Sequence, residues 1–409
     1  MDTLNDVSNT ISQRSRKKVI RRFVPIFLNG IRTVLTPLIF IVFSYLIVRY
    51  HSRELWGGFV DYLLFFYLAS LISNWGSKDY LSRLFSESPS EIIPNWQAHF
   101  TIRIPLLLVT IAAIFLSFKP GAYGAFIIWL CAGYINNAFI PVYTYKRDFG
   151  KVILTELSGL LLLVYLILAN SKTQLSVPDL VYFYALHQLF KSVVYSLLYW
   201  RFFLFKRFPF DYKIILLSLP FFFMGCAGFL QSKVDLYVLG FFHDDALLGD
   251  YQIISGFFVF TQSIATLVLL PYLKNIYRMK SISLNRIRQR MITIGFVLNS
   301  TALLSIALVL HFFFNIQLSI FELLAGFFMG WPSYVYVLNI FYLFKNKMER
   351  EVLKICVFSL CINLILSLVL LSLDMETLGV LTANAVAQLV AMSFYLGKKI
   401  DDDLFKEIK

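Results

Sequence analysis

About twelve apolar segments, each long enough to cross a lipid bilayer, follow one another along this 409-residue chain. Backbone amides in hydrocarbon must find partners inside the protein, and these segments are too long and too continuously apolar for the alternating strands of a barrel. The pattern therefore predicts an all-α polytopic membrane protein. The expected spans are 23–48, 57–75, 100–118, 123–145, 151–169, 180–203, 214–241, 251–273, 291–314, 318–344, 352–373 and 378–397.

Lysine and arginine gather in every second gap between these segments. The basic clusters lie at 14–22, 78–83, 146–151, 201–213, 274–290, 345–354 and 398–409. The intervening gaps hold only Arg49, Arg53, Lys119 and Lys172. Because positive charge stays in the cytoplasm during insertion, both termini are predicted to be cytoplasmic and the number of spans to be even.

The net charge of +13 follows from this topology and does not indicate nucleic-acid binding. A nucleic-acid site would need a folded basic domain, whereas the longest polar stretch, 76–99, has mixed charges and is predicted to be a solvated loop.

Cysteines 131, 226, 356 and 361 fall inside apolar segments, so we expect buried thiols rather than disulfides or metal ligands. GxxxxGK, HExxH and GxSxG patterns are absent. Their absence argues against an enzyme, and no metal or other cofactor is predicted.

Two pairs of short motifs indicate that the chain contains two copies of one unit. A Gly-x-aromatic step occurs at 55–59 (LWGGF) and again at 247–251 (LLGDY), and 185–189 (ALHQL) matches 385–389 (AVAQL). Transporters commonly contain such repeats, with the substrate path between them. We therefore expect two pseudo-symmetric six-helix bundles, an N-terminal lobe at 1–213 and a C-terminal lobe at 214–409.

Four stretches resemble the polysaccharide flippases of the multidrug/oligosaccharidyl-lipid/polysaccharide exporter superfamily, Wzx-type O-antigen flippases in particular. Residues 57–83 are similar to that family's second helix, 138–149 to the exit of its fourth, and 378–388 to its last. The most specific stretch, 219–251, combines a proline-aromatic start, Asp235 and a G-x-Y opening of the next helix.

The resemblance implies a flippase of the bacterial inner membrane that carries an undecaprenyl-diphosphate-linked oligosaccharide, an O-antigen or capsule repeat unit. Transport would run by alternating access from the cytoplasmic to the periplasmic leaflet. Partners would be membrane lipids, the lipid-linked substrate, and polymerase and chain-length proteins of the same pathway. Two alternatives stay open: a polysaccharide polymerase, which would need a larger periplasmic loop, and a small-molecule exporter, which would need a less cationic lining.

Charged side chains inside the spans are the candidate site residues, because intramembrane charge is costly and usually faces a cavity or a partner. Arg32, Lys191 and Lys233 are predicted to meet the substrate diphosphate, and His187, one helical turn from Lys191, to lie on the same path. The alternatives are a structural ion pair with a nearby carboxylate, snorkelling for Lys233, and a hydrogen-bonded packing role for His187.

Two carboxylates, Asp235 and Glu156, are the candidates for coupling transport to an ion gradient. Asp235 has Gln231 one turn away, a polar strip suited to a proton or a sodium ion. The alternative is a brace in which Asp235 pairs with Arg32 or Lys191 and holds the lobes in register.

Overall fold

The computed structural model describes residues 2–117, 120–205, 212–269, 276, 281–346 and 348–398, and all its regular elements there are helices. Ten of them are long and apolar enough to cross a membrane, and α8 and α10 occupy two further predicted spans. The chain is therefore a multi-pass membrane protein. The α-helices are α1 (Asp2–Tyr50), α2 (Arg53–Asn74), α3 (Ser77–Glu87), α4 (Ile92–Ile102), α5 (Ile104–Ser117), α6 (Tyr123–Lys146), α7 (Phe149–Ala169), α8 (Val177–Leu198), α9 (Lys213–Phe242), α10 (Asp245–Leu269), α12 (Ser281–Phe314), α13 (Ile320–Lys345), α14 (Glu349–Leu371) and α15 (Glu376–Gly397).

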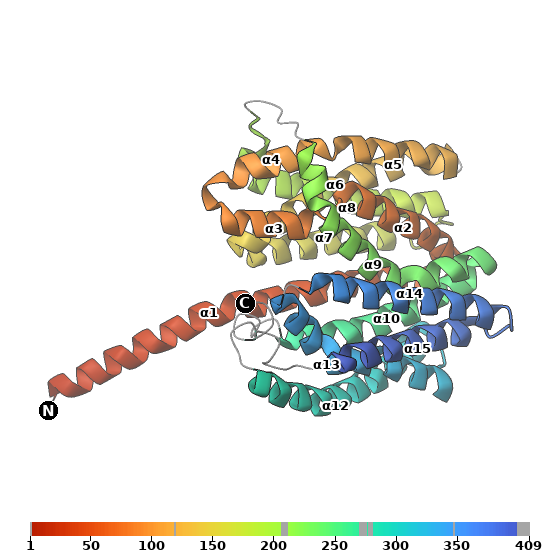
Figure 1. The fold of residues 1–409 in the computed structure, drawn as a ribbon. Helices are drawn as coiled ribbons and strands as arrows, with labels where there is room; N and C mark the ends of the chain where they lie inside the picture. The colour runs from red at the N-terminus through yellow and green to blue at the C-terminus, as the bar shows by residue number, and fades with distance from the viewer. Residues whose placement is uncertain are drawn as a thin grey trace.

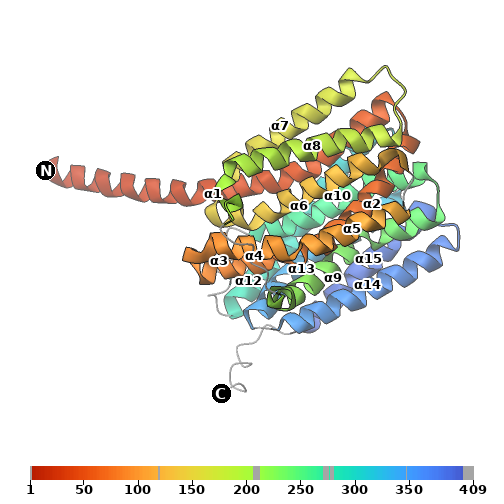
Figure 2. The same ribbon diagram turned by 90° about the horizontal axis from the view of Figure 1, so that it is seen from above.

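The helices form two groups, as the internal repeat predicts. Helices α2 to α8 lie together in the upper half of Figure 1, and α10 to α15 in the lower half. Seen from above, the helices run side by side, and the N-terminal part of α1 extends beyond them (Figure 2). The matched glutamines occupy corresponding places: Gln188 accepts a hydrogen bond from Asn136 of α6, and Gln388 accepts one from Tyr336 of α13. The boundary between residues 213 and 214 stays a prediction.

The repeated Gly-x-aromatic motifs meet each other at the start of α2 and of α10. We call this end of the bundle the outer end, because the charge pattern predicts that it faces the periplasm. A methyl group on Gly57 would overlap the backbone carbonyl of Asp245, and one on Gly249 would lie 3.1 Å from the backbone nitrogen of Gly57. The two copies of the motif therefore form a close helix–helix contact between the lobes.

Polar bonds reinforce this contact, which we call the outer seal. Arg53 pairs with Asp250 at 2.9 Å and donates to the carbonyl oxygen of Phe314 at 2.8 Å. The indole of Trp56, which is fully buried, donates to Gln252 at 3.2 Å. Both lobes thus supply side chains to the seal.

The stretch 76–99 is not a solvated loop, contrary to the prediction. It contains α3 and most of α4, and Leu81, Phe85 and Trp96 are fully buried in one apolar cluster. Leu81 and Phe85 lie four residues apart and share one face of α3, so an amphipathic helix hides its apolar stripe beneath a polar surface. The charged residues between these apolar positions obscured the helical spacing in the sequence.

A second contact between the lobes lies at the opposite, inner end. The α2–α3 turn has positive φ at Trp75 and Gly76, and a methyl group on Gly76 would lie 2.6 Å from the backbone nitrogen of Phe222 in α9. Trp75 stacks on Phe222 with ring centroids 4.1 Å apart and donates its indole N–H to the carbonyl of Ile215. The space between the lobes is therefore bounded near both ends.

Candidate functional site

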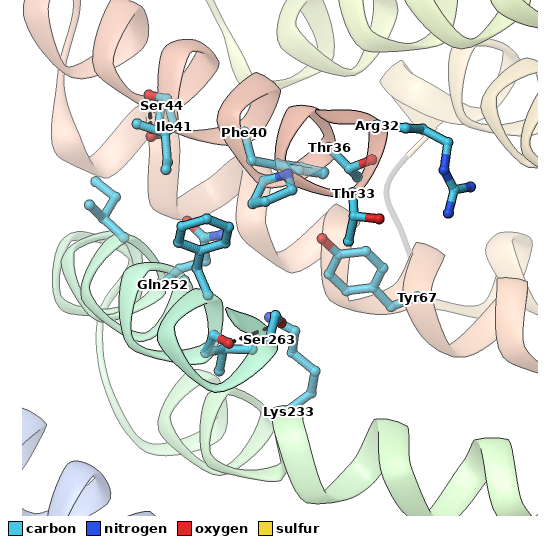
Figure 3. Close-up of a pocket in the computed structure, with 15 residues that line it drawn as sticks. Arg32, Thr33, Thr36, Phe40, Ile41, Ser44, Tyr67, Lys233, Gln252 and Ser263 are labelled. Atoms are coloured by element: carbon cyan, nitrogen blue, oxygen red, sulfur yellow. Dashed lines mark hydrogen bonds between the residues drawn. The ribbon is translucent and has the colours of Figure 1, made fainter. Parts of the chain in front are cut away.

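A cavity of about 420 Å3 lies between the two lobes. We call it the inter-lobe cavity. Helices α1 and α2 line one side and α9 and α10 the other, as Figure 3 shows for Arg32, Tyr67, Lys233 and Gln252. Its wall is mostly apolar or aromatic, with hydroxyl groups from α1 and α10. Its lining residues are Arg32, Thr33, Thr36, Pro37, Phe40, Ile41, Ser44, Tyr67, Lys233, Gln252, Ile253, Gly256, Val259, Phe260 and Ser263.

Two of the predicted cations line this cavity without a carboxylate partner in the described part of the chain. The Arg32 guanidinium donates to the hydroxyl of Tyr143 at 3.0 Å and lies over the rings of Tyr143 and Phe149, while its Nε atom has no partner there. The Lys233 ammonium lies 5.6 Å from the ring centroid of Tyr67. Aromatic faces stabilise both charges but leave their hydrogen-bond donors available.

A second cavity of about 350 Å3 opens among the helices of the N-terminal lobe. We call it the N-lobe cavity. It shares Arg32, Thr36, Phe40 and Tyr67 with the inter-lobe cavity, so the two adjoin at this point. The remaining lining residues come from α1, α2, α6, α7 and α8 and include His187 and Lys191.

Lys191 is paired, unlike Arg32 and Lys233. Its ammonium lies 2.7 Å from a carboxylate oxygen of Glu156, and both side chains are about nine-tenths buried. Tyr195 donates a hydrogen bond to the other oxygen of Glu156 at 3.2 Å. The structure thus shows the ion pair that the sequence left as an alternative for Lys191, between α7 and α8.

Removing either member of this pair is expected to destabilise the protein, because it leaves a buried charge without compensation at a cost of about 3–5 kcal/mol. Glu156→Gln and Lys191→Met should each lower the unfolding temperature in detergent and the amount of protein in the membrane. The double variant should recover both, since neither charge then remains. A double variant no more stable than the singles would contradict a structural pair.

His187 is brought to the same cavity but has no hydrogen-bond partner among the residues that the structure describes. The side chain is 1% exposed, lies against Gly159, and neither ring nitrogen is bonded in the described structure. A buried imidazole with both nitrogens unsatisfied is costly. The hydrogen-bonded packing role is therefore not what the structure shows.

Asp235 faces away from the inter-lobe cavity, although Lys233 is only two residues earlier. Residues two apart point to different sides of a helix, and Asp235 accepts hydrogen bonds from Tyr251 at 2.6 Å and Asn384 at 2.9 Å. All three residues are at least 99% buried. Gln231 bonds instead to Ser359 of α14. No arginine or lysine pairs with Asp235 among the residues described, so the predicted brace to Arg32 or Lys191 is wrong.

One intramembrane cation, Arg103, went unnoticed in the sequence. It is fully buried where α4 ends, lies over the ring of Tyr134, and donates to the carbonyl oxygens of Ser73, Asn74 and His99. Capping the last carbonyls of α2 is a structural task, because those groups lack partners within the helix. Arg103 lies inside the predicted span 100–118, and this position could have identified it in the sequence as an intramembrane cation.

Comparisons with known proteins identify the fold through solved structures. No protein-family model and no curated protein sequence matches the chain. Among solved structures, the lipid II flippase MurJ in an inward closed conformation aligns with a TM-score of 0.66 and 14% identity over 91% of this chain and 87% of its own. An inward-facing multidrug resistance MATE family transporter of the MOP superfamily aligns at 0.60 and 11% over 91% and 96%. A Vibrio cholerae MATE transporter aligns at 0.57 and 13% over 93% and 96%. The chain therefore has the two-lobed helical fold of the MurJ flippase and the MATE transporters.

Proposed function

We propose that this protein is a flippase of the MOP superfamily that moves an undecaprenyl-diphosphate-linked oligosaccharide from the cytoplasmic to the periplasmic leaflet of the bacterial inner membrane. The observation that carries the proposal is the presence of two cations, Arg32 and Lys233, without ion-pair partners among the described residues in one cavity between the lobes. Intramembrane cations are expensive, and a negatively charged cargo would compensate both. The charge pattern predicts that both termini are cytoplasmic.

The rest of the inter-lobe cavity suits an amphiphile. Phe40 and Ile41 of α1 and Val259 and Phe260 of α10 provide apolar surface beside the cations. A diphosphate that joins a lipid to a sugar has this same division of charged and apolar parts. Among proteins of this fold, MurJ is a lipid II flippase, which supports a lipid-linked cargo.

A small-molecule exporter is the second candidate, because MATE transporters share the fold. A polysaccharide polymerase is disfavoured by the short connections at the outer end, of which 170–176 is the longest between described helices. Deletion of the gene separates the three functions. A flippase predicts lipid-linked repeat units accumulating on the cytoplasmic face, a polymerase predicts them on the periplasmic face, and an exporter predicts no accumulation.

We further propose that Asp235 couples transport to a proton or sodium gradient. Glu156, the other candidate, is ion-paired with Lys191, whereas Asp235 is a buried carboxylate surrounded by neutral donors. The amide oxygen of Asn384 is buried without a partner in the described structure. A carboxylate beside an unused amide oxygen is the oxygen-rich chemistry that a small hard cation prefers, and a proton is the alternative ligand.

Asp235→Asn is expected to abolish the stimulation of flipping by an ion gradient while leaving binding of the lipid-linked substrate intact. The substitution keeps the shape of the side chain but removes its negative charge. Flipping of a fluorescent lipid-linked oligosaccharide would be measured in proteoliposomes under proton or sodium gradients. Ser359→Ala, which changes a polar group that bonds Gln231 in the same lobe, is the control. Unchanged gradient dependence in Asp235→Asn would remove the coupling role.

A further inference from the structure

We propose that the N-lobe cavity is the binding site for the sugar residue attached directly to the substrate diphosphate. The inference rests on the proposed function, which places the diphosphate at Arg32 and Lys233. It adds a separate subsite, with its own chemistry, for one uncharged polyhydroxylated ring.

The positions of the two cavities support this division. Arg32 and Tyr67 line both of them, so a ligand whose anion meets Arg32 has the N-lobe cavity next to it. The N-lobe cavity has a volume of about 350 Å3, near the lower end of ligand pockets, roughly 300–1,000 Å3. Such a volume suits a single ring better than a whole oligosaccharide repeat.

The lining has the two features that sugar recognition requires. The lining includes the aromatic side chains of Phe66, Tyr67 and Tyr184, which the C–H side of a ring can contact. Hydrogen-bonding groups for hydroxyls come from His187 and Asn136, which are at least 92% buried, and three of their polar atoms have no partner in the described structure. A neutral imidazole offers one donor and one acceptor, and an amide oxygen accepts. A ring hydroxyl both donates and accepts, so it matches this set.

The charges of the cavity argue against a charged ring. Lys191 and Glu156 neutralise each other at 2.7 Å, and Tyr195 occupies the remaining carboxylate oxygen. A ring bearing an amine would have to break that pair to find a carboxylate, leaving Lys191 uncompensated. A ring bearing a carboxylate would compete with the diphosphate for Arg32, which lines both cavities. An uncharged ring leaves the pair intact.

The chain contains a matched control for His187. His99 is fully buried and also has both ring nitrogens unbonded in the described structure, but it packs against Tyr80 and lines neither cavity. Any effect of losing an unpaired buried imidazole on folding should therefore appear in both His187→Leu and His99→Leu. An effect on sugar binding should appear only in the first.

The test measures dissociation constants for the purified full-length protein in nanodiscs. The probes are farnesol, farnesyl diphosphate, and farnesyl diphosphate bearing glucose, galactose, N-acetylglucosamine or N-acetylgalactosamine. We expect at least one sugar-bearing lipid to bind more tightly than farnesyl diphosphate. His187→Leu should reduce this gain about three- to tenfold, the effect of one lost neutral hydrogen bond, without changing the affinity for farnesyl diphosphate. His99→Leu should keep the full gain.

A second variant covers the case in which His187→Leu does not fold. Asn136 donates to Gln188, so Asn136→Leu/Gln188→Met removes both partners of that bond together, which is tolerated better than removing one. It should likewise reduce the sugar-dependent gain.

Three results would overturn the subsite: no gain from any sugar in the wild-type protein, equal losses for farnesyl diphosphate and its glycosides in the cavity variants, or the same loss in His99→Leu. Failure of the proposed function looks different. In that case farnesyl diphosphate binds no better than farnesol, and Arg32→Gln changes neither affinity.

Discussion

Under the proposed function, glycan export is expected to fall at least about a hundredfold when Arg32 and Lys233 are both changed to glutamine. Each cation is proposed to make a charge-assisted bond to the diphosphate, worth about 1.5–3 kcal/mol, and 1.4 kcal/mol corresponds to a factor of ten. Neither side chain makes an ion pair in the described part of the chain, and the carboxylate nearest to Lys233 in the sequence, Asp235, keeps its hydrogen bonds from Tyr251 and Asn384. Membrane abundance should therefore stay normal while export of surface polysaccharide is lost.

The matched control removes one arginine and one lysine elsewhere. Arg83 and Lys172 are exposed and line neither cavity, so Arg83→Gln/Lys172→Gln lowers the net charge equally without touching the proposed path. Export would be measured as surface polysaccharide in a deletion strain expressing each variant at matched levels. Full export by the Arg32→Gln/Lys233→Gln protein would remove the cationic path from the mechanism.

A single methyl group at Gly57 is expected to prevent the outer seal from closing. The new carbon would overlap the backbone carbonyl of Asp245, which cannot rotate away as a side chain could. Overpacking costs about 1–3 kcal/mol, so the equilibrium constant for closing the seal should fall about five- to 150-fold. The proposed alternating-access cycle needs this state in each turn, so export should fall with it. Gly124→Ala is the control, because Gly124 has no atom within 4 Å of the added carbon.

The opening itself is measurable with a membrane-impermeant thiol reagent. Ser44 is 3% exposed and lines the inter-lobe cavity, so Ser44→Cys in a cysteine-free background should react slowly from the periplasm. Gly57→Ala should accelerate this labelling, and Gly124→Ala should not. Equal labelling in both proteins would show that the overlap is relieved without opening the seal.

The number and order of spans could be read from the sequence because hydrocarbon imposes long apolar helices whatever their neighbours. The polar stretch 76–99 could not be read in the same way. Its buried positions, Leu81 and Phe85, recur at helical spacing among charged residues, and what covers them lies on α6, far along the chain. The pairing of the two Gly-x-aromatic motifs was also invisible, since a repeat indicates similarity between two segments and not contact between them.

The candidate site was predicted as a set of residues but not as an arrangement. Hydropathy gives the depth of Lys233 and Asp235 but not the direction in which each side chain points, and the two belong to different environments. Helical geometry alone excludes a shared site for residues two positions apart. The bond between Lys191 and Glu156 joins different helices, and no local pattern selects it over a bond to Asp235.

Arg32 and Lys233 have no ion-pair partner among the described residues, and this has an electrical consequence. Under the proposed function, the empty carrier has an excess of positive charge in its cavity, whereas the loaded carrier is neutralised by the diphosphate. Moving one elementary charge through 100 mV is worth about 2.3 kcal/mol. A membrane potential that is negative inside would therefore draw the empty, cationic cavity back toward the cytoplasm while hardly opposing the outward step of the loaded one. The voltage would act on the return half of the cycle, resetting the carrier after each release.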